Sequence, residues 1–250
     1  MSDLVKLVRH RNDAAEIVID RPERHNAMTL DMYESLLAHV EQCTRDSTVR
    51  CILFRGAGGK SFVAGTDIAY FKDFRDGRQG LAYEAFVERV IDTVERIAVP
   101  TIAVIDGWAV GGGLALATAC DFRVCSDGSR FGAPIAKTLS NTLSSRNIAR
   151  LTAAFGVPRV KKMLMLADYL TAQEALACGY VYEVCTKDSL ETAADTLAQR
   201  LAALSPVTQK AVKESLRRIV VEQRLDDDDL IEAVYGSAAF RAAVDAFTSS

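Results

Sequence analysis

The chain has 250 residues, of which 49% are hydrophobic and 25% are charged, which is enough for a large domain with a buried core. Its formal net charge of -3 argues against nucleic acid as the main partner, because no excess of cations exists to replace counterions. The N-terminus has no basic segment followed by an apolar run, and no apolar stretch reaches the roughly 18 residues of a membrane span. We therefore expect a cytoplasmic protein without a membrane partner.

The cysteines and histidines are not spaced like metal ligands. Six cysteines occur without CxxC spacing, and three histidines occur without HExxH spacing, so we expect reduced, mostly buried thiols and no metal site. Residues 226–229 are four consecutive aspartates that lack the alternating ligand spacing of an EF-hand loop. We interpret them as a solvated turn whose charge suits the start of a helix.

Short β-type runs alternate with amphipathic stretches along residues 1–188. The alternation predicts an α/β fold with right-handed crossovers. Thr29 is predicted to cap one helix, and the capping-box pattern of Thr171 and Glu174 opens another that ends at Gly179. The predicted strands cover residues 16–19, 51–54, 101–105, 122–125 and 181–184, and the main predicted helices cover 30–40, 85–97 and 114–119.

The last part of the chain is helical in pattern, with interruptions at Ser205-Pro206 and at Gly236. We therefore divide the chain near residue 188, into an α/β body at 1–188 and a helical region at 189–250.

Two loops join strands to helices and are rich in small residues. The run Gly111-Gly112-Gly113 follows a buried strand and opens a helix, a place where free N–H groups attract negative charge. The segment at 61–68, with Ala64 and Gly65, also follows a strand and also lets a ligand approach the backbone. Each loop taken alone is equally well explained as a turn.

The order of motifs along the chain is more specific than either loop. It closely resembles the crotonase family, the enoyl-CoA hydratase/isomerase group, over about residues 5–184. The resemblance implies a spiral of repeated strand–strand–helix units and a C-terminal helical region that assembles a homotrimer or a dimer of trimers. The motifs that carry it are Arg21-Pro22-x-x-x-Asn26-Ala27-Met28, Phe62-x-Ala64-Gly65-x-Asp67-Ile68, Pro100-x-Ile102-Ala103-x-x-x-Gly107-x-x-x-Gly111-Gly112-Gly113, Ala119-Cys120-Asp121 and Phe131-Gly132-x-Pro134.

The resemblance also implies a site for acyl-CoA, with coenzyme A entering as part of the thioester substrate and no tightly bound cofactor. The backbone N–H groups of Thr66 and Gly112 would point at the thioester oxygen, where negative charge accumulates in an enolate. Arg24 would pair with a CoA phosphate or else is an exposed loop cation, and His25 would pack beside CoA rather than act as a base. The residues implied to bind CoA are Arg24, His25, Ala27, Ala64, Gly65, Asp67 and Ile68.

The sequence departs from the family where hydratases carry two catalytic glutamates. Ala115 and Ile135 stand in those positions, and neither side chain can transfer a proton. In the polar segment at 139–145, Asn141 and Ser144 either orient a water or substrate carbonyl or serve as turn and helix-capping residues. The segment contains no carboxylate.

Other residues near the two loops are assigned more general roles. Asp67 and Asp121 are predicted to brace loops, and Trp108 is predicted to pack. Tyr70, Tyr83 and Glu84 lie on a helical segment from which side chains could reach the acyl group.

Three hypotheses follow from the sequence. The leading one is an acyl-CoA enzyme whose acid/base group is non-standard or is supplied by the substrate, and the reaction would be hydration, double-bond shift, or hydrolytic or carbon–carbon cleavage. The second is a non-catalytic acyl-CoA binder or assembly partner. The third, a purely structural glycine-rich α/β protein, predicts no CoA binding at all.

Overall fold

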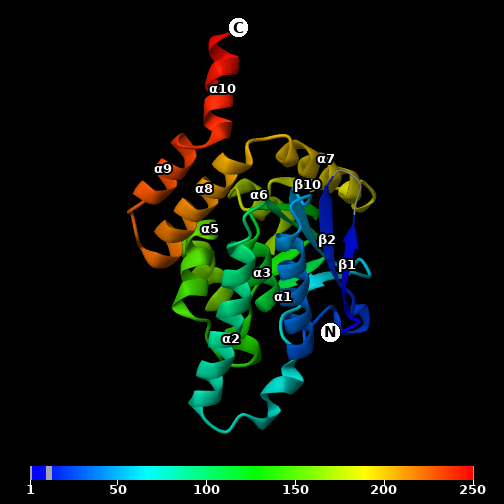
Figure 1. Ribbon diagram of the computed structural model, residues 1–250. Coiled ribbons are helices and arrows are strands. Elements are labelled where there is room, and N and C mark those ends of the chain that lie inside the picture. Colours follow the sequence, from blue (N-terminus) through cyan, green and yellow to red (C-terminus); the bar gives the residue numbers. More distant parts are fainter. Residues whose placement is uncertain (1, 10–12, 250) are drawn as a thin grey trace.

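The computed structural model describes residues 2–9 and 13–249, and within them the strands form two sheets (Figure 1). The six-stranded sheet has the order β1-β2-β3-β5-β7-β10, and the four-stranded sheet has the order β4-β6-β8-β9. β1 pairs antiparallel with β2 and β8 with β9, whereas the other pairs are parallel. The strands are β1 (Val5–Arg9), β2 (Ala14–Ile19), β3 (Cys51–Gly56), β4 (Ser61–Val63), β5 (Thr101–Ile105), β6 (Trp108–Val110), β7 (Phe122–Ser126), β8 (Arg130–Gly132), β9 (Leu170–Thr171) and β10 (Glu183–Cys185).

The chain repeats one structural unit. A strand of the six-stranded sheet is followed by a short strand of the four-stranded sheet and then by a helix, as in β3-β4-α2, β5-β6-α3 and β7-β8-α4. This arrangement confirms the predicted α/β class and its strand–strand–helix repeat. Because every unit turns from a long strand into a short strand and then a helix, the loops of successive units lie next to one another.

The helices begin where the sequence offers capping side chains. Thr29 Oγ1 accepts the Met32 N–H, and Thr171 and Glu174 form the predicted capping box. The helices are α1 (Leu30–Arg45), α2 (Gly77–Glu95), α3 (Gly112–Ala119), α4 (Ile135–Thr138), α5 (Ser145–Leu164), α6 (Ala172–Ala177), α7 (Leu190–Ala202), α8 (Pro206–Arg217), α9 (Asp228–Tyr235) and α10 (Ala238–Thr248), with short helical turns η1 (Pro22–Arg24), η2 (Ile68–Asp73) and η3 (Lys187–Ser189) and a π-helical segment η4 (Arg218–Glu222).

Some predicted boundaries shift. α2 begins at Gly77 rather than near residue 85, because the Asp76 side chain accepts the N–H groups of Arg78 and Gln79 and caps the helix early. The last strand begins at Glu183, two residues later than predicted, because its pairing with β7 starts at Glu183.

The two faces of the larger sheet bury separate apolar clusters. On β3, Ile52 and Phe54 belong to the main cluster with residues of α1, α2, α3 and α5, whereas Leu53 belongs to a second cluster with residues of α7. This alternation is the period of two expected of a strand covered on both faces.

The C-terminal helices differ in how closely they pack. α7 contacts β3, β5, β7 and β10, so it covers the larger sheet, and the predicted division at 188 falls within η3. By contrast, α10 extends away from the rest of the chain (Figure 1), and its Val244 and Phe247 are exposed. Among residues 2–9 and 13–249, no helix is both long enough and apolar enough to cross a membrane.

Candidate active site

Arg21 and Asn26 hold the first loop of the site in place. The Arg21 guanidinium donates to the Ala27 carbonyl at 2.9 Å and to the Asp67 carboxylate at 2.8 Å. The fully buried Asn26 amide donates to the carbonyls of Ala57 and Ser61, and its oxygen accepts the Arg21 N–H. These bonds explain the Arg-Pro-x-x-x-Asn-Ala spacing, because they tie residues 21–28 to the loop that contains Thr66.

Thr66 lies where its backbone N–H is left without a protein acceptor. Met28 donates its N–H to the Gly65 carbonyl at 2.8 Å, and its own carbonyl accepts the Asp67 N–H at 2.9 Å. Met28 and Thr66 thus form a parallel β-bridge, in which Thr66 directs its own N–H and C=O away from Met28. Within the described part of the chain, the Thr66 N–H accordingly donates to no protein atom.

The glycine triplet packs against the same loop. A Cβ on Gly113 would lie 1.9 Å from the Val63 carbonyl oxygen, so only glycine permits this approach of α3 to β4. Gly112 is the first residue of α3, and its N–H also has no acceptor among the described residues. Gly65 has φ +91°, and a Cβ there would lie 3.5 Å from the Gly112 nitrogen. The structure therefore brings the two predicted donors onto adjoining loops.

A cavity of about 500 Å³ lies beside Thr66. Most of the residues predicted to bind CoA contribute to its walls. His25 Nδ1 lies 3.3 Å from the Ser61 hydroxyl, and Arg24 is exposed and has no ion pair among the described residues. The predicted residues in the walls are Arg24, His25, Ala27, Ala64, Thr66, Asp67 and Ile68; Gly65 lies behind them against the glycine triplet.

The same cavity has an aromatic wall that the sequence did not predict. Trp108 and Tyr169 are partly exposed, and their rings meet edge to face with centroids 4.9 Å apart. Trp108, predicted to pack, thus also faces the cavity. Tyr169 comes close because β8 pairs with β9, a long-range contact that leaves no local pattern in the sequence.

Asp67 combines two supporting roles. Its carboxylate accepts the Ala69 N–H at 3.0 Å and thereby caps η2, and it also pairs with Arg21. The hydrogen bond from Arg21 holds the pKa of Asp67 below its usual value, so the residue is a carboxylate near neutral pH.

Asp121 also stabilises a loop, as predicted: its carboxylate accepts the N–H and hydroxyl of Thr101 and pairs with Lys213.

The Thr66 side chain joins two tyrosines behind the backbone donors. Its hydroxyl lies 3.0 Å from the Tyr33 hydroxyl and 2.7 Å from the Tyr83 hydroxyl. Burial raises the pKa of Tyr33 to about 12 and also raises the pKa of Tyr83, so both phenols keep their protons near neutral pH. They act as neutral hydrogen-bonding groups that fix Thr66.

A second cavity, of about 400 Å³, begins at Tyr83. Tyr83 packs edge to face against Phe71, with ring centroids 4.8 Å apart, and the hydroxyl chain links this cavity to Thr66. Its walls are mostly apolar but include one carboxyl group. The residues that line it are Phe71, Phe74, Gly77, Gly80, Leu81, Tyr83, Glu84, Leu139, Asn141 and Thr142.

The remaining predicted pocket residues occupy different places. Ala115 is buried in α3, and Ile135 begins α4 and packs on the main core. Asn141 lines the second cavity. Ser144 caps α5: its hydroxyl accepts the Asn147 N–H and donates to Glu88, and its N–H donates to Glu84.

Among the described residues, no group of three or more metal-binding side chains is close enough to hold an ion.

Comparison with known proteins decides the family. The sequence profile of the enoyl-CoA hydratase/isomerase family matches residues 9–248. The chain belongs to the enoyl-CoA hydratase/isomerase family. The predicted crotonase resemblance is therefore confirmed, and with it the class of enzyme, that of the enoyl-CoA hydratases and isomerases.

Similar proteins in this family differ in their named reactions. The chain is 30% identical over 212 residues, 85% of this chain and 80% of the relative, to a short-chain-enoyl-CoA hydratase of Clostridium acetobutylicum. It is 29% identical to a trans-2-decenoyl-[acyl-carrier-protein] isomerase of Streptococcus mutans, over 81% of this chain and 78% of the relative. A crystal structure of an enoyl-CoA hydratase/carnithine racemase from Magnetospirillum magneticum superposes with a TM-score of 0.89 and 29% identity, covering 100% of this chain and 94% of that one.

Proposed function

We propose that this member of the enoyl-CoA hydratase/isomerase family holds the oxygen of an acyl-CoA thioester with the backbone N–H groups of Thr66 and Gly112. The observation that carries the proposal is a pair of N–H groups on adjoining loops that have no acceptor among the described residues, beside a cavity lined by most of the residues predicted to bind CoA. When a proton leaves the acyl chain, negative charge moves onto the thioester oxygen, and one fixed donor is worth about 3 kcal/mol in such a site.

In this proposal the CoA portion lies in the cavity of about 500 Å³ and the acyl group enters the cavity of about 400 Å³. Arg24 supplies a cation for a CoA phosphate, and Trp108 with Tyr169 supplies an apolar wall for the pantetheine or adenine. The Tyr83 hydroxyl stands between the two cavities, because it bonds to Thr66 and also lines the acyl side.

The absence of glutamates at positions 115 and 135 restricts the chemistry. Ala115 and Ile135 cannot activate a water, so rapid hydration of a simple 2-enoyl-CoA is not expected. The same observation supports the alternative that the chain binds acyl-CoA without turnover.

Acyl-CoA binding and turnover, measured together, test the proposal. We expect calorimetric binding of acetyl-CoA and of trans-2-hexenoyl-CoA, and turnover of at least one member of a panel of 2-enoyl-, 3-enoyl- and 3-hydroxyacyl-CoA thioesters. Binding of the panel without any turnover would favour the non-catalytic alternative. No binding of any thioester would contradict both.

A gain-of-function variant tests the placement of the two missing glutamates. Ala115→Glu combined with Ile135→Glu is expected to raise crotonyl-CoA hydration by roughly a hundredfold or more over the starting protein, measured by loss of enoyl absorbance. The single variants serve as controls, because water activation in hydratases uses both carboxyl groups. No gain in a folded double variant that still binds crotonyl-CoA would count against the mapping.

We also propose a homotrimer, or a dimer of trimers, in the cytoplasm. The exposed apolar side chains on α9 and α10, among them Ile231, Tyr235 and Phe247, support assembly through the C-terminal helices. Light scattering on the full chain and on a Phe247→Asp variant tests this, because a monomeric wild-type protein would contradict it.

A further inference from the structure

We propose that Glu84 is the proton-transfer residue of this enzyme and that its reaction is a double-bond shift in an enoyl thioester. The inference rests on the acyl-CoA function proposed above. It assigns the acid/base role that Ala115 and Ile135 cannot fill to a carboxyl group on a different element, α2.

Glu84 lies in the wall of the acyl cavity and is held in a fixed position. Its Oε2 accepts the backbone N–H of Ser144 at 2.8 Å, at the start of α5. Its Oε1 accepts no hydrogen bond from the described residues. One oxygen is therefore anchored, and the other is free to approach a ligand in the cavity that Glu84 shares with Phe71, Phe74 and Leu139.

The other acidic residues that follow on α2 show that Glu84 is an exception. Glu88 and Glu95 pair with the buried Arg150 at 2.7 and 2.9 Å, and Asp92 lies 3.8 Å from the same guanidinium. Glu84 has no cationic partner among the described residues. An unpaired, half-buried carboxyl is costly to keep, which marks it as a functional group rather than a stabilising one.

The surroundings of Glu84 suit a group that gains and loses a proton. Burial raises its pKa, the nearby Glu88 carboxylate raises it further, and the Ser144 N–H opposes both effects. A carboxyl whose pKa is raised toward neutrality is a better base than an exposed one and a readier acid once protonated.

The position of Tyr83 places the carboxyl along the path of the acyl chain. Tyr83 bonds to Thr66 at one end and lines the acyl cavity, and Glu84 follows it on the same helix and lines the same cavity. An acyl chain whose thioester oxygen lies at Thr66 and Gly112 therefore passes Tyr83 and meets Glu84.

A single carboxyl group is enough for a double-bond shift. In a 3-enoyl thioester, Glu84 takes a proton from C2, and the C–H electron pair forms the C1=C2 bond of a dienolate whose negative charge lies on the thioester oxygen. The protonated Glu84 then delivers the proton to C4: the C3=C4 electron pair forms the new C4–H bond, the C1=C2 pair moves to form the C2=C3 bond, and the thioester carbonyl re-forms. No water, oxidant or second acid is consumed, which suits a site without the two glutamates of a hydratase.

Deuterium incorporation measures this step directly. Wild-type protein, Glu84→Gln and Glu84→Asp are incubated in D2O with trans-3-hexenoyl-CoA or trans-2-hexenoyl-CoA, and label at C2 and C4 is followed by NMR and mass spectrometry. Glu84→Gln keeps an oxygen for the Ser144 N–H, so we expect intact folding and affinity but incorporation slowed roughly 10²- to 10⁴-fold. Glu84→Asp should retain part of the rate.

Glu34→Gln is the matched control, because Glu34 is an exposed glutamate that contacts α2 through Arg89 at 3.3 Å, away from both cavities. It should exchange at the wild-type rate. Equal exchange by wild type and Glu84→Gln, or no exchange by a wild type that binds both thioesters, would overturn the role of Glu84. Failure of the wild type to bind either thioester would instead overturn the proposed function itself.

Discussion

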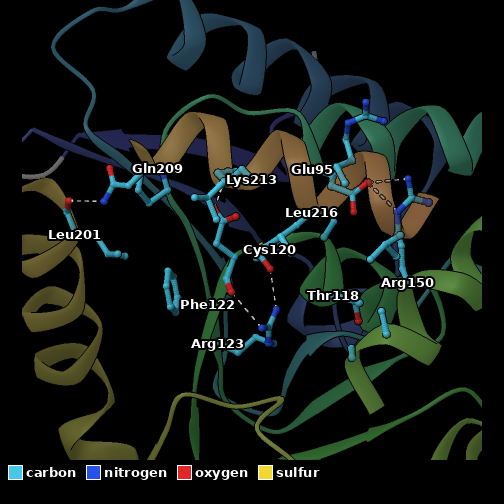
Figure 2. A pocket seen from close by; sticks show the side chains of 18 of the residues that line it. Glu95, Thr118, Cys120, Phe122, Arg123, Arg150, Leu201, Gln209, Lys213 and Leu216 are labelled. Atoms are coloured by element: carbon cyan, nitrogen blue, oxygen red, sulfur yellow. Dashed lines mark hydrogen bonds and ion pairs between the residues drawn. The ribbon is translucent and has the colours of Figure 1, made fainter. Parts of the chain in front are cut away.

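Two cavities of similar size show what distinguishes a binding site from a packing space. The larger, about 540 Å³, lies between α8 and the α/β body (Figure 2). Several of its charged side chains are paired with one another, as in Arg150 with Glu95 and Lys213 with Asp121. The cavity beside Thr66 instead contains Arg24 without an ion pair among the described residues, and it adjoins two loop N–H groups without acceptors.

The comparison teaches that unpaired backbone donors beside a cation without an ion pair, rather than volume, distinguish the candidate site within the described part of the chain. Arg123, in the wall of the larger cavity, donates to the Cys120 carbonyl (Figure 2) and also to the carbonyls of Ala117 and Tyr180, so its donors already have partners. A ligand there would have to break bonds that stabilise the fold. Substitutions in the larger cavity should therefore change stability, and substitutions beside Thr66 should change acyl-CoA handling.

The largest effect is expected from Arg150→Ala. The change leaves the partly buried Glu88 and Glu95 without their cation, so the free energy of unfolding should fall by about 3 kcal/mol in urea titrations. Arg89→Ala removes an exposed pair with Glu34 and should cost less than about 1 kcal/mol. Equal losses in the two variants would contradict the stabilising role assigned to the ion pairs of the larger cavity.

The next largest effect is expected at the backbone donors. Proline at position 112 removes one N–H at the first position of α3, where proline is tolerated, but a Cβ there would lie 2.9 Å from the Tyr33 hydroxyl. The variant is therefore made in a Tyr33→Phe background. Relative to Tyr33→Phe alone, Tyr33→Phe/Gly112→Pro should lose about 10²- to 10³-fold in deuterium exchange of hexenoyl-CoA.

The affinity for acyl-CoA should be retained in that double variant, because the donor acts most strongly on the charge that develops during reaction. Exchange rates that do not differ between the two variants would exclude Gly112 as a donor.

A smaller effect is expected from Arg24→Ala. Loss of one charged contact to a phosphate should weaken calorimetric binding of CoA by about tenfold, and the difference should shrink as salt is added. An acyl-pantetheine without the nucleotide should bind both proteins equally. Arg45→Ala, an exposed change on α1, is the control, and if it weakened CoA binding as much as Arg24→Ala, a specific contact would be refuted.

The smallest effect concerns acid stability near the larger cavity. Hydrogen bonds from Arg217 lower the pKa of Glu214 from 4.5 to about 2. Because the folded pKa is depressed, its contribution to stability is present above about pH 4.5 and is lost as pH falls toward 2. Glu214→Gln should flatten the decline of unfolding free energy between these values. Glu232→Gln, on the exposed face of α9, should leave the slope unchanged.

The sequence predicted the parts of the site that depend on local geometry. The glycine triplet and the Ala64-Gly65 pair were expected to let a ligand approach the backbone, and the order of motifs, through its resemblance to the crotonase family, implied which residues belong to the candidate site. The strands at 51–54 and 101–105 were also correct, because runs of buried β-branched and aromatic residues between turns have few alternatives.

What the sequence could not predict depends on contacts between distant segments. Tyr169 contacts Trp108, and Arg150 pairs with Glu88 rather than with Glu84. Both contacts join residues that lie 40 or more positions apart in the sequence. Glu84 could be placed on a helix near the acyl group, but its lack of a cation is visible only when Arg150 has been located.

The chain of three hydroxyls behind Thr66 has a consequence for the polarity of the site. Tyr33, Thr66 and Tyr83 carry three hydroxyl hydrogens but make two bonds with one another, so one hydrogen is left over, and where the two bonds run in the same direction it lies at one end of the chain. In one order Tyr83 directs it toward the acyl cavity, and in the other Tyr33 directs it toward Gly112. Rotation of three O–H groups thus moves a donor from one side of Thr66 to the other, with no heavy atom displaced.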